Sequence, residues 1–211
     1  MPSVDYELKL QEQGYRFIAG IDEAGRGCWA GPVVAAAVVL RPLALVQPDL
    51  LAGIDDSKRL SAAKREALLD TIERFSEGIG VGAVPAFLID SLGIVRATQL
   101  AMEVAVFHLP RLPDALLIDA LHLPALPLVQ QPIIGADHLS YSVAAASIVA
   151  KTTRDRLMRG LERGEARYGF AVHKGYGTAL HRSALAQWGP CDEHRRSFRP
   201  LWNEEYDGNR Y

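Results

Sequence analysis

The amino-acid sequence predicts an α/β fold, in which two strands come first and helices then alternate with strands. Two apolar runs, at residues 15–22 and 31–40, have the length and composition of strands. Helix-spaced segments and shorter apolar runs alternate after them. Because this order is typical of one sheet covered by helices, it favours a layered α/β domain. The 211 residues suit one domain of ordinary size.

Residues 40–110 supply two helical segments and one strand. Residues 60–75 have apolar positions at helical spacing, and Ser61 is placed to cap that helix. Residues 81–84 form a short strand. Residues 85–109 are a second helical stretch, which Pro110 ends.

The second half of the chain continues the alternation. Residues 114–120 and 131–137 are two further short strands, separated by a connection rich in proline. Residues 138–169 read as one long helix, and the remainder is predicted to form a loop and short helices.

Carboxylates stand where three of the predicted strands end. Asp22 and Glu23 follow the first strand, while Asp119 and Asp137 end two later ones. Each has an ordinary alternative, since Asp137 could cap the following helix and the others could be turn residues. Because ligands of α/β sheets gather at the carboxyl ends of strands, we expect the four carboxylates to converge if these strands are neighbours.

Such a cluster needs a counter-charge, because like charges this close do not all stay ionised. Oxygen ligands with few histidines favour Mg²⁺ or Mn²⁺ over zinc. Two such ions roughly 4 Å apart are the usual arrangement for in-line attack on a phosphodiester. The strand ends therefore predict a metal site.

Glycines follow the first pair of acids, in the order Gly25, Arg26, Gly27. The segment "GRGCWA" also fits the dinucleotide-binding pattern G-x-G-x-x-A. That pattern requires a helix to begin at the glycines, and the β-branched run at 33–39 opposes one. Glycines beside a metal site would instead let backbone groups approach a ligand closely.

Composition narrows the class of protein. Apolar residues make up 49 % of the chain and charged residues 23 %, with a net charge of −2, which indicates a packed core and no overall basic field. No apolar run is long enough to span a membrane, and two cysteines with no targeting pattern favour a reducing cytoplasm. Basic residues gather in residues 171–200, which contain Lys174, Arg182, Arg195, Arg196 and Arg199.

Six sequence blocks in order resemble the bacterial ribonuclease HII family. They are "GIDEAGRG", "DDSKRLS", "LLIDA", "GAD" followed by "SVAAASIVAK", "HKGYGT" and "HRRSFRP". The resemblance implies a ribonuclease H-like fold, with a mixed five-stranded sheet flanked by helices. It also implies a catalytic core at residues 1–160 and a C-terminal helical extension at residues 161–211. That extension would pack on the core and contact a duplex through its basic face.

The resemblance implies an endonuclease that cuts the RNA strand of RNA–DNA hybrids. It would also nick 5′ of single ribonucleotides in duplex DNA, by two-metal catalysis with Mg²⁺ or Mn²⁺ that leaves 3′-OH and 5′-phosphate ends. The family's acidic ligands carry over to Asp22, Glu23, Asp119 and Asp137. Its substrate-binding positions carry over to Gly25, Arg26, Gly27, Ser57, Lys58, Ser147 and Tyr176. In this assignment the glycine loop senses the ribose 2′-OH, Tyr176 reads the junction with DNA, and the protein is a monomer.

Three matters stay open at this point. A catalytically inert module that binds duplexes, with the carboxylates serving as turns and caps, would have the same charge pattern. One departure from the family pattern is Ala136, which separates Gly135 from Asp137. His181 and His194 fit either proton carriers or structural histidines.

Overall fold

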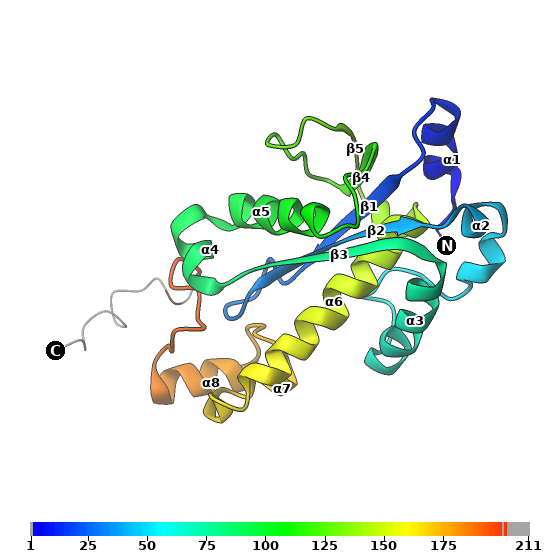
Figure 1. Ribbon diagram of the computed structural model, residues 1–211. Coiled ribbons are helices and arrows are strands. Elements are labelled where there is room, and N and C mark those ends of the chain that lie inside the picture. Colours follow the sequence, from blue (N-terminus) through cyan, green and yellow to red (C-terminus); the bar gives the residue numbers. More distant parts are fainter. Residues whose placement is uncertain (1, 200, 202–211) are drawn as a thin grey trace.

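Five strands form one mixed sheet in the computed structural model, which describes residues 2–199 and 201 (Figure 1). Their order across the sheet is β3-β2-β1-β4-β5. The strands are β1 (Ile18–Ala24), β2 (Val33–Leu40), β3 (Ser76–Val84), β4 (Ala115–Asp119) and β5 (Val129–Ile133). β1, β2 and β3 are antiparallel neighbours, whereas β4 and β5 run parallel to β1. The expected mixed five-stranded sheet is confirmed.

Helices cover both faces of this sheet. The helices are α1 (Asp5–Glu12), α2 (Pro42–Val46), α3 (Ala62–Phe75), α4 (Ala86–Leu92), α5 (Ile94–Phe107), α6 (Tyr141–Leu161), α7 (Phe170–His173) and α8 (Ala179–Trp188), with 3₁₀ turns η1 (Pro48–Leu51), η2 (Ala136–His138) and η3 (Ala166–Tyr168). In Figure 1, α4 and α5 lie on one side of the sheet and α3 and α6 on the other. α7 and α8 pack at the far end of α6, around a separate apolar cluster.

The central strand β2 shows why the sheet is enclosed on both sides. All eight of its residues are buried. Ala35, Ala37 and Val39 face the α5 side, while Ala36 and Val38 face α6. Successive side chains of a strand point to opposite faces, so an unbroken apolar run requires two covered faces.

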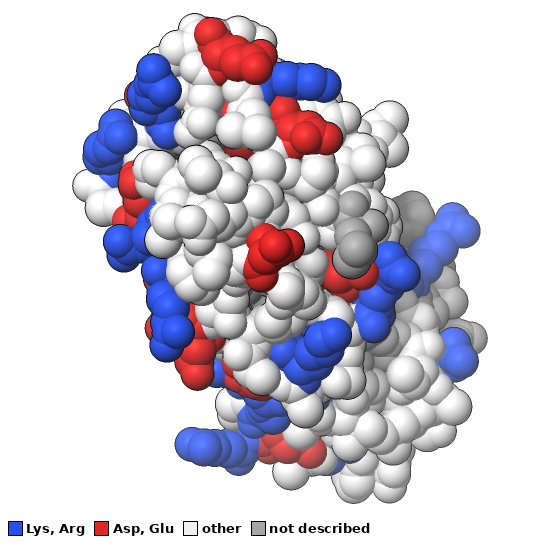
Figure 2. Space-filling view, turned by 90° about the vertical axis from the view of Figure 1, so that its right-hand side faces the viewer, with Lys and Arg blue, Asp and Glu red and all other residues white. Residues whose placement is uncertain are grey.

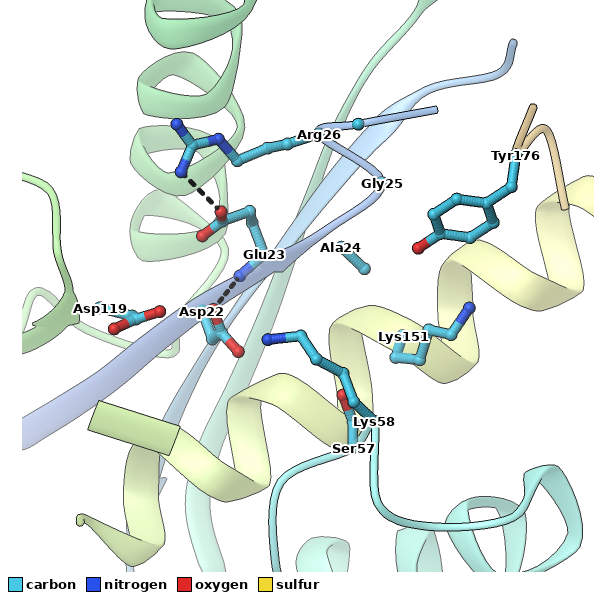
Figure 3. Close-up of a pocket in the computed structure, with 11 residues that line it drawn as sticks. Asp22, Glu23, Ala24, Gly25, Arg26, Ser57, Lys58, Asp119, Lys151 and Tyr176 are labelled. Atoms are coloured by element: carbon cyan, nitrogen blue, oxygen red, sulfur yellow. Dashed lines mark hydrogen bonds and ion pairs between the residues drawn. The ribbon is translucent and has the colours of Figure 1, made fainter. Parts of the chain in front are cut away.

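A glycine in β1 brings α6 close to the sheet. A Cβ atom at Gly20 would lie 2.3 Å from the carbonyl carbon of Ser142. The missing side chain therefore allows the start of α6 to rest on β1. As a result, Ser147 and Lys151, further along α6, lie near the carboxyl end of that strand (Figure 3).

The helical stretch expected at 85–109 is two helices. Gly93 separates α4 from α5, with a φ of +75° that side-chain-bearing residues rarely adopt. Helical spacing alone does not reveal this break, because the apolar positions on both sides belong to one core cluster. The strand expected at 81–84 is also longer and begins at Ser76, where it pairs with Leu40 of β2.

The long helix begins and ends inside its expected range of 138–169. α6 starts at Tyr141, and the side chain of Ser140 accepts a hydrogen bond from the Val143 N–H as its N-cap. Asp137 therefore is not the cap of this helix. The helix ends at Leu161, where Gly160 and Gly164 lower the helical propensity.

The acidic N-terminal segment forms α1, a helix that the sequence patterns did not indicate. Its Glu7 is 1 % exposed, although glutamate is rarely buried. The carboxylate accepts hydrogen bonds from the Ser140 hydroxyl (2.6 Å), the Ser142 hydroxyl (2.6 Å) and the Ser142 N–H (3.0 Å). Glu7 thus ties the N-terminus to the first turn of α6.

Replacement of this anchor gives a first prediction. Glu7→Ala should lower the free energy of unfolding by about 2–4 kcal/mol, because it leaves buried hydroxyl donors without their charged acceptor. Urea denaturation of the variant and the wild type measures this. Glu12→Ala, an exposed position on the same helix, is the control and should change stability by less than about 0.5 kcal/mol. Equal effects of the two substitutions would contradict an anchoring role.

Candidate active site

A hollow lies at the carboxyl ends of β1 and β4 (Figure 3). It is lined by Asp22, Glu23, Ala24, Gly25, Arg26, Gly27, Ser57, Lys58, Asp119, Lys151 and Tyr176. These residues come from the end of β1 and its following loop, the loop before α3, the end of β4, α6 and the loop after α7. Nine of them are positions that the sequence singled out, so the structure brings most of the candidate site together.

Strand pairing places two of the acids side by side. β1 and β4 are parallel neighbours, with Ile21 opposite Ile118. Asp22 and Asp119 are the next residue on each strand, so they leave the sheet at the same level. The convergence expected from the strand ends is therefore present for this pair.

Asp119 also shapes the segment that carries the fourth acid. Its Oδ1 accepts the N–H groups of Gly135 (2.9 Å) and Ala136 (3.2 Å). Gly135 has a left-handed backbone, with a φ of +70°. The chain after β5 thus turns back toward β4, and Ala136 supplies one of the two donors that hold this turn.

Asp137 lies in η2, four residues beyond the end of β5, so the expected strand 131–137 is too long at its C-terminal end. The residue is 2 % exposed and is not part of the lining of the hollow. Burial raises the pKa of Asp137, although the ammonium of Lys58, 3.5 Å away, opposes this. Lys58 links the hollow to Asp137, because it lines the hollow and forms an ion pair with the Asp137 carboxylate.

Asp22 and Glu23 are held in an environment that disfavours their charged forms. Asp22 is 4 % exposed, and burial, then the charges of Glu23 and Asp119, raise its pKa well above the usual range. Its Oδ1 accepts the Glu23 N–H at 2.7 Å. Burial also raises the pKa of Glu23, although Arg26 donates to Glu23 Oε1 at 3.2 Å.

These carboxylates fit a divalent cation bound through oxygen. Glu23 Oε2 is buried and has no hydrogen-bond partner among the described residues. A buried acceptor left unpaired is costly, and a bound cation would satisfy it. The same cation would offset the effect of burial, which raises the pKa values of Asp22, Glu23 and Asp137.

Asp56 and His138 extend this acidic region, and sequence reasoning missed both. With Asp137 they place possible ligand atoms within 4.8 Å of one another. Asp56 is buried and lies directly before Ser57 in the loop that also carries Lys58. Partial burial lowers the pKa of Lys58, but the nearby carboxylates outweigh burial and raise this pKa overall. These carboxylates are Asp137, Asp22 and Asp56.

The loop after β1 depends on a glycine and on a buried arginine. Gly25 has a φ of +94°, and a Cβ there would lie 1.9 Å from Arg154 Nε. Arg154 is fully buried and donates to the carbonyls of Pro32 (2.8 Å), Lys174 (2.8 Å) and Ala30 (3.0 Å). One guanidinium thus joins the loop after β1 to the loop that precedes Tyr176.

A second arginine, Arg195, supports the same loop from the C-terminal segment. It is fully buried and donates to the carbonyls of Arg26 (2.8 Å) and Gly31 (3.0 Å). Burial lowers its pKa to about 10. The expectation that Arg195 belongs to a basic surface is wrong, because its guanidinium is buried and donates hydrogen bonds to backbone carbonyls.

The dinucleotide-binding alternative is excluded by the backbone. The chain after Gly27 enters β2 at Val33, so no helix begins at the glycines. A pyrophosphate would therefore lack the helix N-terminus on which that motif depends.

Tyr176 forms one wall of the hollow, opposite the acids (Figure 3). The residue is 43 % exposed. Lys151 Nζ lies 5.6 Å from the ring centroid and 2.7 Å from Asp155 Oδ1. Lys151 was missed in the sequence, although it is one helical turn after Ser147 and so shares its face of α6.

Ser147 is buried under the hollow rather than lining it. Its hydroxyl donates to the hydroxyl of Ser57 at 2.7 Å. Of the two serines, Ser57 is the one that lines the hollow.

Charges of both signs alternate over the face shown in Figure 2, in keeping with the net charge of −2. That face carries no single large basic patch. Within residues 2–199 and 201, no helix is long and apolar enough to cross a membrane.

The family model and the curated relatives agree on one family, and the solved structures share its fold. The family model described as "Ribonuclease HII" matches residues 19–205. Ribonuclease HII of Chloroflexus aurantiacus is 57 % identical over 201 residues, which cover 95 % of this chain and 95 % of that protein. Among solved structures, ribonuclease H2 of Pyrococcus horikoshii superposes with a TM-score of 0.75 at 24 % identity, covering 92 % of this chain and 100 % of that one. Bst-RNase HIII in complex with Mn²⁺ superposes with a TM-score of 0.63 at 21 % identity, covering 85 % and 72 %.

Proposed function

We propose that the hollow at the ends of β1 and β4 is the active site of this chain, which belongs to the ribonuclease HII family. The protein is accordingly an endonuclease that hydrolyses RNA in RNA–DNA hybrids, and family membership decides against the inert duplex-binding module. One observation carries the placement of the site. Asp22 and Glu23 of β1, whose pKa values are raised by burial, meet Asp119 of the adjacent strand β4 there, beside a glycine loop and the exposed Tyr176.

Four carboxylates would hold the metal ions, namely Asp22, Glu23, Asp119 and Asp137. Their oxygen-only chemistry suits Mg²⁺ or Mn²⁺, and one structure of the same fold has been solved with Mn²⁺. When bound, two divalent ions would supply activation of a water and neutralisation of charge on the leaving 3′ oxygen. The charges of Glu23 and Asp119 both act on Asp22 and raise its pKa. We therefore assign Asp22 as the ligand shared by both ions.

The rest of the hollow would hold the substrate strand. Gly25 and Gly27 present backbone groups to the ribose 2′-OH, which distinguishes RNA from DNA. Arg26, Ser57 and Lys58 are placed to contact phosphates, and buried Ser147 would act by orienting Ser57. The exposed ring of Tyr176 offers a stacking surface for the nucleotide that follows the ribonucleotide. These contacts would direct cleavage to the 5′ side of single ribonucleotides in DNA.

The C-terminal extension is proposed to grip the duplex backbone. Within it, Arg182 is exposed and Lys174 and Arg196 are partly exposed, so these cations can reach phosphates, unlike Arg195. Residues 200 and 202–211 of the proposed extension at 161–211 lie outside the described residues. We place the division between core and extension at residue 160, near the end of α6. The protein is proposed to act as a cytoplasmic monomer on RNA–DNA hybrids and ribonucleotide-containing DNA.

A nicking assay tests the proposed function. Labelled duplex DNA with one ribonucleotide should be cut on its 5′ side in Mg²⁺ or Mn²⁺, and EDTA should abolish the cut because the carboxylates then lack their ions. Restoring excess Mg²⁺ should restore cleavage. Duplex binding without any metal-dependent nicking would contradict the active-site assignment.

A further inference from the structure

Three buried histidines lie directly under the Tyr176 loop. His173 ends α7, His181 is in α8, and His194 follows α8 in the C-terminal segment. All three are buried, and the rings of His173 and His181 are stacked with centroids 4.3 Å apart. The proposed catalytic chemistry uses none of them.

Backbone partners fix where the proton sits on two of these rings. The Cys191 N–H can only donate, and it points at His194 Nδ1 (3.0 Å), so that nitrogen is an unprotonated acceptor. The Tyr176 carbonyl can only accept, and it lies 3.0 Å from His181 Nδ1, so that nitrogen carries hydrogen. These assignments leave one direction for the bond between the two rings.

The two Nε2 atoms of His181 and His194 are 3.0 Å apart, and a hydrogen bond there needs one hydrogen. His194 has its hydrogen on Nε2, and His181 has a bare Nε2, so His194 donates. Burial lowers the pKa of His181 to about 4 and that of His194 to about 3, so both rings are neutral at physiological pH. The chain of donors therefore runs from Cys191 through His194 and His181 to the carbonyl of Tyr176.

His173 bonds to the residue that precedes Tyr176. Its Nδ1 accepts the Gly175 N–H at 3.1 Å, so its Nε2 carries the hydrogen that the Tyr168 carbonyl accepts at 2.6 Å. The residue before Tyr176 and the carbonyl of Tyr176 itself are thus both bonded to buried histidines. The side chain of Tyr176 is left facing the hollow.

We propose that His181 and His194 are positioning residues for Tyr176. His194 donates to the bare Nε2 of His181, and His181 in the Nδ1–H tautomer donates to the Tyr176 carbonyl. The tautomer therefore sets the height and angle of the tyrosine ring over the substrate. The functional half of this inference rests on the proposed role of Tyr176 in reading the RNA–DNA junction.

Nitrogen NMR of the histidine rings tests the tautomers independently of activity. Long-range ¹H–¹⁵N spectra of the wild type at neutral pH should show His181 as Nδ1–H and both His173 and His194 as Nε2–H. His194→Leu removes the donor to His181 Nε2 and should shift the ¹⁵N signal of that nitrogen, whereas the amide of His194→Gln can still donate and should preserve the wild-type signal. A wild-type His181 in the Nε2–H form would overturn the proposal, whether or not His194→Leu folds. His122→Gln, at an exposed position, is the control.

Cleavage of two substrates tests the consequence. The ratio of single-turnover rates on a single ribonucleotide in DNA and on a long hybrid should fall about tenfold in His194→Leu. The rate on the long hybrid should stay within about threefold, and His194→Gln should retain the wild-type ratio. An unchanged ratio in a folded His194→Leu protein would overturn the positioning role.

Tyr176→Ala separates this failure from a failure of the proposed function. If Tyr176→Ala also leaves the ratio unchanged, the role assigned to Tyr176 is wrong, and the positioning role falls with it. If Tyr176→Ala lowers the ratio and His194→Leu does not, only the positioning role is wrong.

Discussion

Asp22→Asn is expected to lower kcat by at least roughly 10³, because it removes a charge that both metal ions would share. The same substitution should stabilise the metal-free protein. Asp22 is buried next to Glu23 and Asp119, and burial and these charges raise its pKa well above the usual range. Asparagine keeps the shape of the side chain and removes one member of the repelling cluster. Loss of activity with a gain in stability would distinguish a metal ligand from a structural acid.

The pH dependence follows from the sign of this shift. Folding raises the pKa of this carboxyl above 3.8, its ordinary value and the one taken for the unfolded chain. The carboxyl therefore contributes fully to stability at pH values below 3.8, and this contribution is lost as the pH rises through the pKa of the folded state. At neutral pH the metal-free wild type therefore bears the cost of a buried charge, and Asp22→Asn does not. The free energy of unfolding of Asp22→Asn should exceed that of the metal-free wild type by an amount that grows as the pH rises from about 4. Addition of Mg²⁺ to the wild type should reduce this difference.

Urea denaturation in EDTA and single-turnover cleavage in Mg²⁺ measure the two effects. Asp70→Asn makes the same chemical change at an exposed position of α3 and is the matched control. Activity of Asp22→Asn within about tenfold of wild type would exclude the assignment as shared ligand. A stability equal to that of Asp70→Asn would exclude the repulsion.

The sequence was sufficient to predict features set by local pattern. The acids Asp22 and Asp119 could be placed together because each follows an apolar run, and parallel strands end at one edge. Asp137 was harder, because it reaches the region through a turn. That turn depends on the left-handed Gly135 and on two N–H donors bound by Asp119, which are tertiary contacts between separate segments.

Counting charges could not separate surface cations from buried ones. Arg195 resembles Arg182 in the sequence, yet it is buried and donates to the backbone of the glycine loop. Glu7 is an acidic residue with the same behaviour. Its segment has the composition of an exposed polar N-terminus, but Glu7 is buried because the hydroxyls of Ser140 and Ser142 donate hydrogen bonds to it. Hydrogen bonds from distant segments decide the burial of such groups, and local periodicity carries no signal for them.

Gly27→Ala is expected to impair cleavage at a single ribonucleotide by about 10²-fold while leaving duplex affinity within about threefold. The structure makes this substitution informative, because a Cβ at Gly27 meets nothing within 4 Å and Gly27 has an ordinary backbone conformation. The fold should therefore be unchanged, and the new methyl group would act only where a ribose approaches the loop. Gly25→Ala is the contrasting variant, since its Cβ would collide with Arg154 and its φ is +94°. It should disturb stability as well as activity.

Three duplexes separate recognition of the 2′-OH from recognition of the junction: all-DNA, DNA with one ribonucleotide, and a long RNA–DNA hybrid. The wild type should cut the second on the 5′ side of the ribonucleotide and leave the first intact, because backbone groups at hydrogen-bond distance need the 2′-OH as a partner. Gly27→Ala should lose activity on both ribonucleotide-containing substrates, since both present that hydroxyl. Tyr176→Ala should mainly lose its preference for the single ribonucleotide, because the exposed ring of Tyr176 would contact the deoxyribose beyond it. Equal cutting of all-DNA and single-ribonucleotide duplexes by the wild type would contradict the 2′-OH assignment. The two substrates differ only in that hydroxyl, so equal rates would mean that the backbone groups of the glycine loop do not recognise it.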